Sequence, residues 1–362
     1  MECLCSCIPP HNFIKVANND RNTDININYP LKAIEVQDDD AQYNFIFLNF
    51  NNLSYKDINL NNTPKLINLM QQYTSYNYHF LPYENMWDNV FSAVYSLPTM
   101  YEGSIRQEGK MSVLVEEFLR QQYHNDIIVS HEETLNYQNI STITAMRRPN
   151  ITITTTDKEA LDTALTQIKD WKENKHYELT LFLSDLSFTK NDKQYRANLY
   201  KVDQYIYKLY KELENTQKLN NIIFIITSLS GNKQKYEQES IYNRDRQHVP
   251  FIVISGLDTF KQKVYKDISS HFDIAPSILE FALGTTTKSW YYAVGQNIFN
   301  QNNVKENFVL KNDDLLFISK YNTIVYTDEG TSYIEKDGNQ YKIKPNLEDL
   351  IEAMQNINRF IE

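Results

Sequence analysis

Apolar residues along this 362-residue chain occur in short runs that alternate with longer segments of helical periodicity. The clearest run is NIIFIITSLSG at 221–231, where apolar and mostly β-branched residues lead into a turn of small polar ones. A strand that is apolar on both faces needs helices on both sides, as in the centre of an open α/β sheet. The turn after such a strand opens the ligand crevice, so residues 227–231 are the first candidates for chemistry.

Strand and helix patterns alternate before this run. The segment YNFIFLNFN at 43–51 predicts a first buried strand, and 127–129 and 179–183 predict shorter ones. Apolar residues three or four positions apart predict helices, most clearly at 195–216 and also at 63–73, 89–97, 112–123 and 161–171. Residues 1–40 are polar and interrupted by prolines, so we interpret them as an arm or linker.

The pattern changes after the central run. HVPFIVISG at 248–256 predicts a buried strand, and 269–284 a helix that ends at Gly284. Short antiparallel strands are predicted in 308–344 and a closing helix in 347–360. The fold class is therefore α/β: an α/β/α sandwich with a mostly parallel sheet (41–300) and a small C-terminal antiparallel layer in the same domain (301–362). FIFLNF, IIFIIT and FIVIS should be neighbouring interior strands.

Composition narrows the possible functions. Lysine and arginine number 36 against 46 acidic residues, and this net charge of -10 argues against nonspecific nucleic-acid binding. The only cysteines are Cys3, Cys5 and Cys7, so the body has no disulfide; a disordered end and metal or lipid attachment both remain open for these three. No apolar stretch reaches the length of a membrane helix, and no cleavable signal pattern begins the chain.

Five segments carry a family resemblance: FIFLNFNNL, ENMWDNVFSAVYSLP, IIFIITSLSG, HVPFIVISG and SSHFDIAPSILEFALG. Their order resembles the alkaline phosphatase and sulfatase superfamily, and the last two segments are the most specific. Within it, the chain is most similar to the periplasmic domain of YejM/PbgA-type inner-membrane proteins, through YPLKAIEV, YRANLYKVDQYIYKLYKEL, YYAVGQNIF and LIEAMQNINRFIE. The resemblance covers residues 29–362 and implies an alkaline phosphatase-like fold.

The resemblance also implies where a two-metal ester-hydrolysing site would lie. The metal-binding aspartate after the first strand falls on Asn51, next to Asn52, and an amide lacks the charge that makes binding tight. The nucleophile falls near Asn85 or Met86, and no Ser, Thr or Cys occurs between Ser75 and Ser92. We therefore expect this half of the site to lack both a charged metal ligand and a nucleophile.

The other half differs in the same way. The implied Asp-His pair after the central strand becomes Leu229 and Ser230. The last ligand histidine falls on Arg246, a permanent cation that repels metal, and His248 is two residues out of place. We therefore predict no catalytic residue, no cofactor and no metal at these positions.

Two functions follow from the resemblance. The first is a noncatalytic envelope regulator at the periplasmic face of the inner membrane of a Gram-negative cell. It would be anchored by membrane helices missing from this chain and would bind anionic lipid (lipopolysaccharide) or envelope proteins, not nucleic acid. The alternative is a metal-dependent phosphatase, sulfatase or phosphoglycerol transferase with rearranged ligands, drawn from Asp185, Asp245, His248, His271 and Asp273.

Other residues have a structural and a functional interpretation. His271 and Asp273 begin a predicted helix, where aspartate commonly caps, and Asp88 and Asn89 also suit an N-cap. Arg147 and Arg148 suit phosphate binding, although exposed loop arginines are usually only solvated. Aromatic side chains suit either core packing or a lipid or sugar groove: Trp87, Trp290, Tyr291 and Tyr292.

Overall fold

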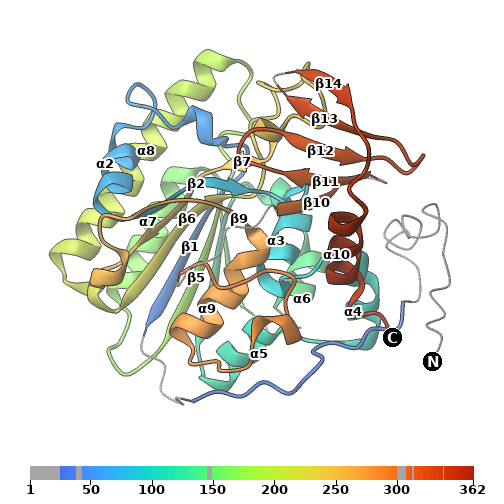
Figure 1. The fold of residues 1–362 in the computed structure, drawn as a ribbon. Helices are drawn as coiled ribbons and strands as arrows, with labels where there is room; N and C mark the ends of the chain where they lie inside the picture. The colour runs from blue at the N-terminus through green and yellow to red at the C-terminus, as the bar shows by residue number, and fades with distance from the viewer. Residues whose placement is uncertain (1–24, 38–42, 145–148, 300–306, 312–313, 337) are drawn as a thin grey trace.

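A computed structural model describes residues 25–37, 43–144, 149–299, 307–311, 314–336 and 338–362 (Figure 1). Its centre is a nine-stranded sheet of order β4-β3-β5-β1-β6-β8-β2-β7, with β9 also paired to β2. The strands are β1 (Asn44–Phe50), β2 (Thr74–Phe80), β3 (His124–Ser130), β4 (Asn150–Thr154), β5 (Tyr177–Leu183), β6 (Ile222–Ser228), β7 (His248–Val249), β8 (Phe251–Ile254) and β9 (Val264–Ser270).

The three predicted interior strands are neighbours in this sheet. β1 runs parallel to β5 and β6, so that Leu48 lies beside Leu181 on one side and Ile226 on the other. β8 lies on the far side of β6 and runs antiparallel to it. The prediction that FIFLNF, IIFIIT and FIVIS lie side by side inside one sheet is therefore confirmed. The sheet is parallel from β4 to β6 and mixed beyond that point.

Helices cover both faces of the sheet (Figure 1). On one face lie α2 (Pro64–Gln72), α7 (Asp157–Lys169) and α8 (Asp192–Asn215), and on the other α3 (Met86–Tyr95), α4 (Glu102–Glu108), α5 (Val113–Arg120), α6 (Tyr137–Ile143) and α9 (Ile274–Ala282). The pleat of β1 sorts its side chains between the two layers: Ile46 and Leu48 join the cluster with α8, whereas Phe45 packs with α5. Each buried side chain of this size stabilises the fold by about 1.5–3 kcal/mol.

The C-terminal layer is a second, five-stranded antiparallel sheet. It comprises β10 (Asn307–Lys311), β11 (Asp314–Ile318), β12 (Thr323–Tyr326), β13 (Ser332–Lys336) and β14 (Asn339–Lys342), and α10 (Leu347–Asn358) follows. Helix α10 buries Met354 and Ile357 in the core, as the predicted closing helix requires. Part of the segment interpreted as an arm packs here too, because Ile27 is buried and bridges to Ile361.

Two predicted helix boundaries are wrong. α3 begins at Met86 with Asn85 as its N-cap, so Asp88 and Asn89 lie inside the helix; Asn85 accepts from the Trp87 backbone N–H at 2.8 Å. The helix predicted from residue 269 begins instead at Ile274, since β9 continues to Ser270 and a 3-10 turn (His271–Asp273) follows. Pairing with β2 makes this segment a strand, which was not predicted from the sequence.

Candidate functional site

The turns after β1 and β6 meet at one edge of the sheet because these two strands are parallel neighbours. Ser230 donates its hydroxyl to Oδ1 of Asn51 at 2.7 Å and accepts the backbone N–H of Asn52 at 2.8 Å. The Leu53 N–H donates to the Ser230 carbonyl at 3.0 Å. The amide and hydroxyl at these two ligand positions therefore bond each other.

Asn52 holds neighbouring loops together at the same edge of the sheet. Its backbone has φ of 81°, in the left-handed region that asparagine tolerates better than most residues. The side-chain NH₂ donates to the Leu186 carbonyl at 3.2 Å, and Oδ1 accepts the Lys233 N–H at 2.9 Å. Both ends of this amide are occupied in joining three loops at the edge of the sheet.

The position that the resemblance implies for the nucleophile is filled by apolar packing. Met86, in the first turn of α3, and Leu229, after β6, are 8% and 2% exposed and share a small apolar cluster with Phe182. The side-chain amide of Asn89 holds the turn after β6 by donating to the Leu229 carbonyl at 2.9 Å. The Met86 thioether lies where the resemblance implies a nucleophile, and the Leu229 isobutyl group lies where it implies a metal ligand.

Arg246, at the position that the resemblance implies for the last metal ligand, is bound by the protein. Its Nε donates to Glu84 at 3.0 Å, and its Nη1 donates to the Tyr236 carbonyl. Gly231 lies directly beneath, because a Cβ there would stand 2.0 Å from the Arg246 carbonyl oxygen. A cavity of about 330 Å³ remains, lined by Tyr83, Glu84, Gly231, Asn232, Lys233, Gln234, Tyr236, Glu237 and Arg246.

His248 is a buried, neutral imidazole. Its Nε2 bonds the Asn77 carbonyl at 2.8 Å, and its ring stacks on Tyr55 with centroids 4.4 Å apart. Burial lowers the pKa of His248 to about 4. The ring therefore packs between Tyr55 and the β2 side chains Tyr78 and Phe80.

His271 and Asp273 lie in the turn between β9 and α9. His271 Nδ1 bonds Nε2 of the buried His79 at 3.0 Å, and burial lowers the pKa of His271 to about 3. Asp273 accepts the Ser270 N–H at 2.7 Å in a capping box and the Gln296 N–H at 2.8 Å. Burial raises the pKa of Asp273 to about 6. Asp273 thus caps the 3-10 turn, whereas at the N-cap position of α9 its side chain makes no capping bond to that helix.

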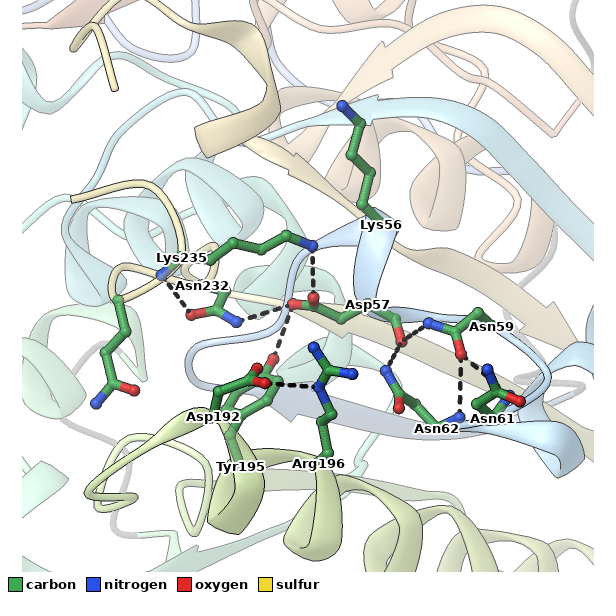
Figure 2. Close-up of a pocket in the computed structure, with 11 residues that line it drawn as sticks. Lys56, Asp57, Asn59, Asn61, Asn62, Asp192, Tyr195, Arg196, Asn232 and Lys235 are labelled. Carbon is green, nitrogen blue, oxygen red and sulfur yellow. Dashed lines mark hydrogen bonds and ion pairs between the residues drawn. The ribbon is translucent and has the colours of Figure 1, made fainter. Parts of the chain in front are cut away.

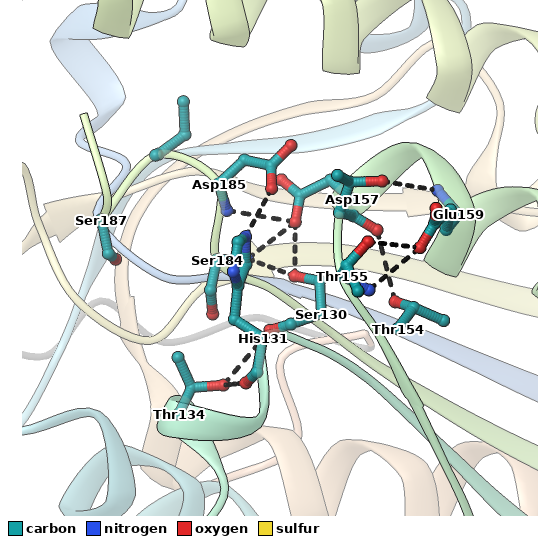
Figure 3. A network of polar contacts seen from close by, with 12 residues as sticks. Ser130, His131, Thr134, Thr154, Thr155, Asp157, Glu159, Ser184, Asp185 and Ser187 are labelled. Atoms are coloured by element: carbon teal, nitrogen blue, oxygen red, sulfur yellow. Dashed lines mark hydrogen bonds and ion pairs between the residues drawn. The ribbon is translucent and has the colours of Figure 1, made fainter.

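A separate polar network lies at the ends of β3 and β5 (Figure 3). His131 Nε2 bonds Oδ1 of Asp185 at 2.7 Å, and His131 has the unusual φ of 68°. Beside them, the buried carboxylate of Asp157 accepts from the Ser130 hydroxyl and from the Ser184 N–H, the latter at 2.8 Å. Burial, with a contribution from Asp185, raises the pKa of Asp157 to about 7. No pattern in the sequence indicates His131, which lies 54 residues from its partner.

The candidates for a rearranged site are not brought together. Asp185 pairs with His131, Asp245 with Lys56, and His248, His271 and Asp273 each bond different partners. Within the described ranges, no group of three His, Cys, Asp or Glu side chains is placed to hold a metal ion. The residues at the implied two-metal site do not fit such ions, since they offer amides, apolar groups and a cation.

The remaining candidates have other positions. Arg147 and Arg148 lie outside the described residues. Trp290 is 54% exposed beneath the Arg359 guanidinium, which lies 4.0 Å from its ring centroid, and Tyr292 is buried in the core. Of the helices in the described ranges, none combines the length and apolar character needed to span a bilayer.

Comparison with known proteins agrees with this fold. The family model described as Sulfatase matches residues 36–285. A protein of the alkaline phosphatase superfamily from Vibrio parahaemolyticus has a similar structure, with a TM-score of 0.71 at 12% identity over 97% of this chain and 94% of that one. The lipoteichoic acid synthase LtaP from Listeria monocytogenes gives 0.65 at 12% identity over 97% of both chains. A phosphonate monoester hydrolase from Silicibacter pomeroyi gives 0.64 at 10% identity over 88% of this chain and 95% of that one. No curated protein matches the sequence.

Proposed function

Because the chain belongs to the Sulfatase family, we propose that it is a noncatalytic member whose crevice serves recognition instead of ester hydrolysis. One observation carries the proposal: the side chains at the implied ligand and nucleophile positions are bonded or packed within the protein. Ser230 bonds Asn51, Leu229 packs beside Met86, and Arg246 pairs with Glu84.

The charge at the crevice supports this proposal. Hard divalent ions are held chiefly by carboxylates, which these positions no longer supply. The guanidinium of Arg246 would repel a metal pair, and its ion pair with Glu84 would have to break to admit one. If His248 were to replace the missing histidine ligand, it would have to leave its buried stack on Tyr55.

The cellular role is the second part of the proposal. The segments similar to the periplasmic domain of YejM/PbgA-type proteins support a role at the periplasmic face of the inner membrane of a Gram-negative cell. There the domain would be held by membrane helices outside this chain and would contact lipopolysaccharide or envelope proteins. Its recognition surface would regulate lipopolysaccharide synthesis without turning over an ester.

Metal analysis combined with an activity assay tests the first part. We expect purified protein to hold well under one divalent ion per chain, and to leave nitrophenyl phosphate and sulfate esters intact with Mg²⁺, Mn²⁺ or Zn²⁺ added. Asn51→Asp, which restores one carboxylate, should change neither result. Stoichiometric metal and a hydrolysis that disappears in His248→Gln or His271→Gln would overturn the proposal and favour the enzyme alternative.

Complementation tests the cellular role. Cells that lack their own YejM/PbgA-type protein would receive this chain with or without a membrane anchor. We expect restored lipopolysaccharide control only with the anchor, and equally for Asn51→Asp. Restoration by the anchorless chain, or its loss in Asn51→Asp with the protein folded, would contradict this role.

A further inference from the structure

A second cavity, of about 500 Å³, lies beside the crevice at the start of α8 (Figure 2). Three segments distant in sequence enclose it: the turn after β1 with the loop that follows, the first turn of α8, and the loop after β6. Its volume falls within the range of small-molecule sites. The lining is Lys56, Asp57, Asn59, Asn61, Asn62, Asp192, Tyr195, Arg196, Asn232, Gln234 and Lys235.

A buried carboxylate organises the floor of this cavity. The side chain of Asp57 is 8% exposed and accepts from the Tyr195 hydroxyl at 3.0 Å, the Asn232 amide at 3.1 Å and Lys235 Nζ at 2.8 Å. These bonds tie the three segments together before any ligand arrives. A site held in this way loses little conformational entropy on binding.

The cations around the cavity are more exposed than this floor. Arg196 Nε pairs with Asp192 at 2.8 Å, and the two side chains are 63% and 70% exposed. An exposed pair of this kind contributes about 0–1 kcal/mol, so a ligand can recruit the guanidinium at small cost. The Lys56 and Lys235 side chains are 56% and 39% exposed, while their partners Asp245 and Asp57 are largely buried. The carboxylates that balance the two lysines are therefore largely buried, whereas Asp192, which balances Arg196, is exposed and lines the cavity with it.

The amides supply a second kind of contact. Asn59 and Asn62 each donate their NH₂ to the Asp57 carbonyl, at 3.1 and 3.0 Å. The amide oxygen of Asn62 thus remains as an acceptor at the wall, and the exposed Asn61 beside it can donate and accept. Groups of this kind suit hydroxyls, which also donate and accept.

We propose that this cavity binds a polyhydroxylated ligand with one anionic oxygen group, of the chemical class of hexose phosphates and hexuronates. Arg196 and Lys235 receive the anion through charge-assisted hydrogen bonds, and the asparagine wall receives the hydroxyls. The cavity adjoins the crevice that contains Arg246 and shares Asn232 and Gln234 with its lining. The inference does not rest on the absence of catalysis in that crevice.

Calorimetric titration of the full chain tests the proposal. The probes are a panel of hexose 1- and 6-phosphates and hexuronates, with the neutral hexoses and inorganic phosphate titrated separately. We expect at least one anionic sugar to bind tighter than both its neutral sugar and inorganic phosphate. Arg196→Ala should weaken that binding about tenfold or more, the usual effect of losing a hydrogen bond to a charged group. Added salt should weaken it as well.

Lys158→Ala is the matched control, since Lys158 is an exposed, ion-paired residue outside the lining. It should leave the affinity unchanged, and circular dichroism should show Arg196→Ala folded, because this side chain is exposed and outside the core. Three results would overturn the proposal: no binding by any anionic sugar in the panel, equal affinity in Arg196→Ala, or inorganic phosphate binding as tightly as the sugars. The last would mark a simple anion site without hydroxyl recognition.

Discussion

Ser230 donates its hydroxyl to Oδ1 of Asn51 across 2.7 Å, where the ends of the parallel strands β6 and β1 meet. The same hydroxyl oxygen accepts the Asn52 N–H. The Ser230 side chain thus links the two turns at the edge of the sheet where the superfamily resemblance implies a metal ligand. The contact stabilises the fold where the resemblance implies a metal site.

Ser230→Ala should therefore destabilise the protein. It leaves the buried Asn52 N–H and Oδ1 of the Asn51 side chain without their partner, and such a loss costs about 1–3 kcal/mol. Urea unfolding at pH 7 measures the change. Ser187→Ala is the control, because Ser187 is only half buried and donates a longer bond, 3.2 Å, to the Asn51 carbonyl. A smaller loss for Ser230→Ala than for Ser187→Ala would show that the Ser230 bonds do not secure this edge.

Gly231→Ala should disturb the Arg246 loop. An added Cβ would lie 2.0 Å from the Arg246 carbonyl oxygen, a distance that forces the backbone to move. We expect a loss well above the roughly 1 kcal/mol of ordinary backbone strain. Gly109→Ala supplies that reference, since Gly109 has φ of 64° and open space around its Cβ position. Equal unfolding free energies for the two variants would contradict the tight packing of Gly231 beneath Arg246.

The apolar strands were predictable and the polar ones were not. β1, β6 and β8 carry runs that only a covered sheet tolerates, so their adjacency followed from the sequence. β2 reads TSYNYHF, and its buried polar residues conceal it. Its His79 is accommodated because Ser269 and His271, about 190 residues away, arrive beside it. Local pattern does not reveal such partners.

The same reason limits prediction of sites. The altered positions at Asn51 and Leu229 could be located from the segments around them. The Asp57 cavity could not, because Lys235 reaches Asp57 across 178 residues and only the pairing of β1 with β6 brings their loops together. The His131 and Asp185 pair likewise depends on β3 and β5 being parallel neighbours.

Asp157 should make the protein less stable at alkaline pH. Its pKa is raised to about 7 from an ordinary value near 4, so the folded state binds a proton that the unfolded chain releases. This stabilisation is complete below the unfolded pKa and is lost as the pH rises through 7. From pH 5 to pH 8 the loss should be about 2–3 kcal/mol.

Asp157→Asn removes this titration and should flatten the decline. Urea unfolding at pH 5, 6, 7 and 8 measures it, with the exposed Asp328→Asn as control. A residual decline from Asp273, whose pKa is raised to about 6, should persist in every variant. Identical pH profiles for Asp157→Asn and the unchanged protein would show that Asp157 is already ionised when folded.

The buried histidines should have the opposite effect in acid. Burial lowers the pKa of His248 to about 4 and of His271 to about 3, and the pKa of His79 is also well below its usual range. These rings stay neutral in the folded state while the unfolded chain takes up protons below pH 6.5. Their contribution is therefore complete above pH 6.5 and is lost as the pH falls toward the folded values.

His248→Gln isolates one of these contributions. Glutamine can still donate to the Asn77 carbonyl but cannot titrate, so the variant should be less stable at pH 7, where it lacks the stack on Tyr55. Its further loss between pH 7 and pH 5 should be about 2 kcal/mol smaller than that of the unchanged protein. Protonation of Asp157 and Asp273 opposes the histidines in both proteins and cancels in this difference. The exposed His124→Gln should keep the original acid dependence. If His248→Gln kept it as well, His248 would titrate as an exposed histidine, and its burial between Tyr55 and the sheet would be wrong.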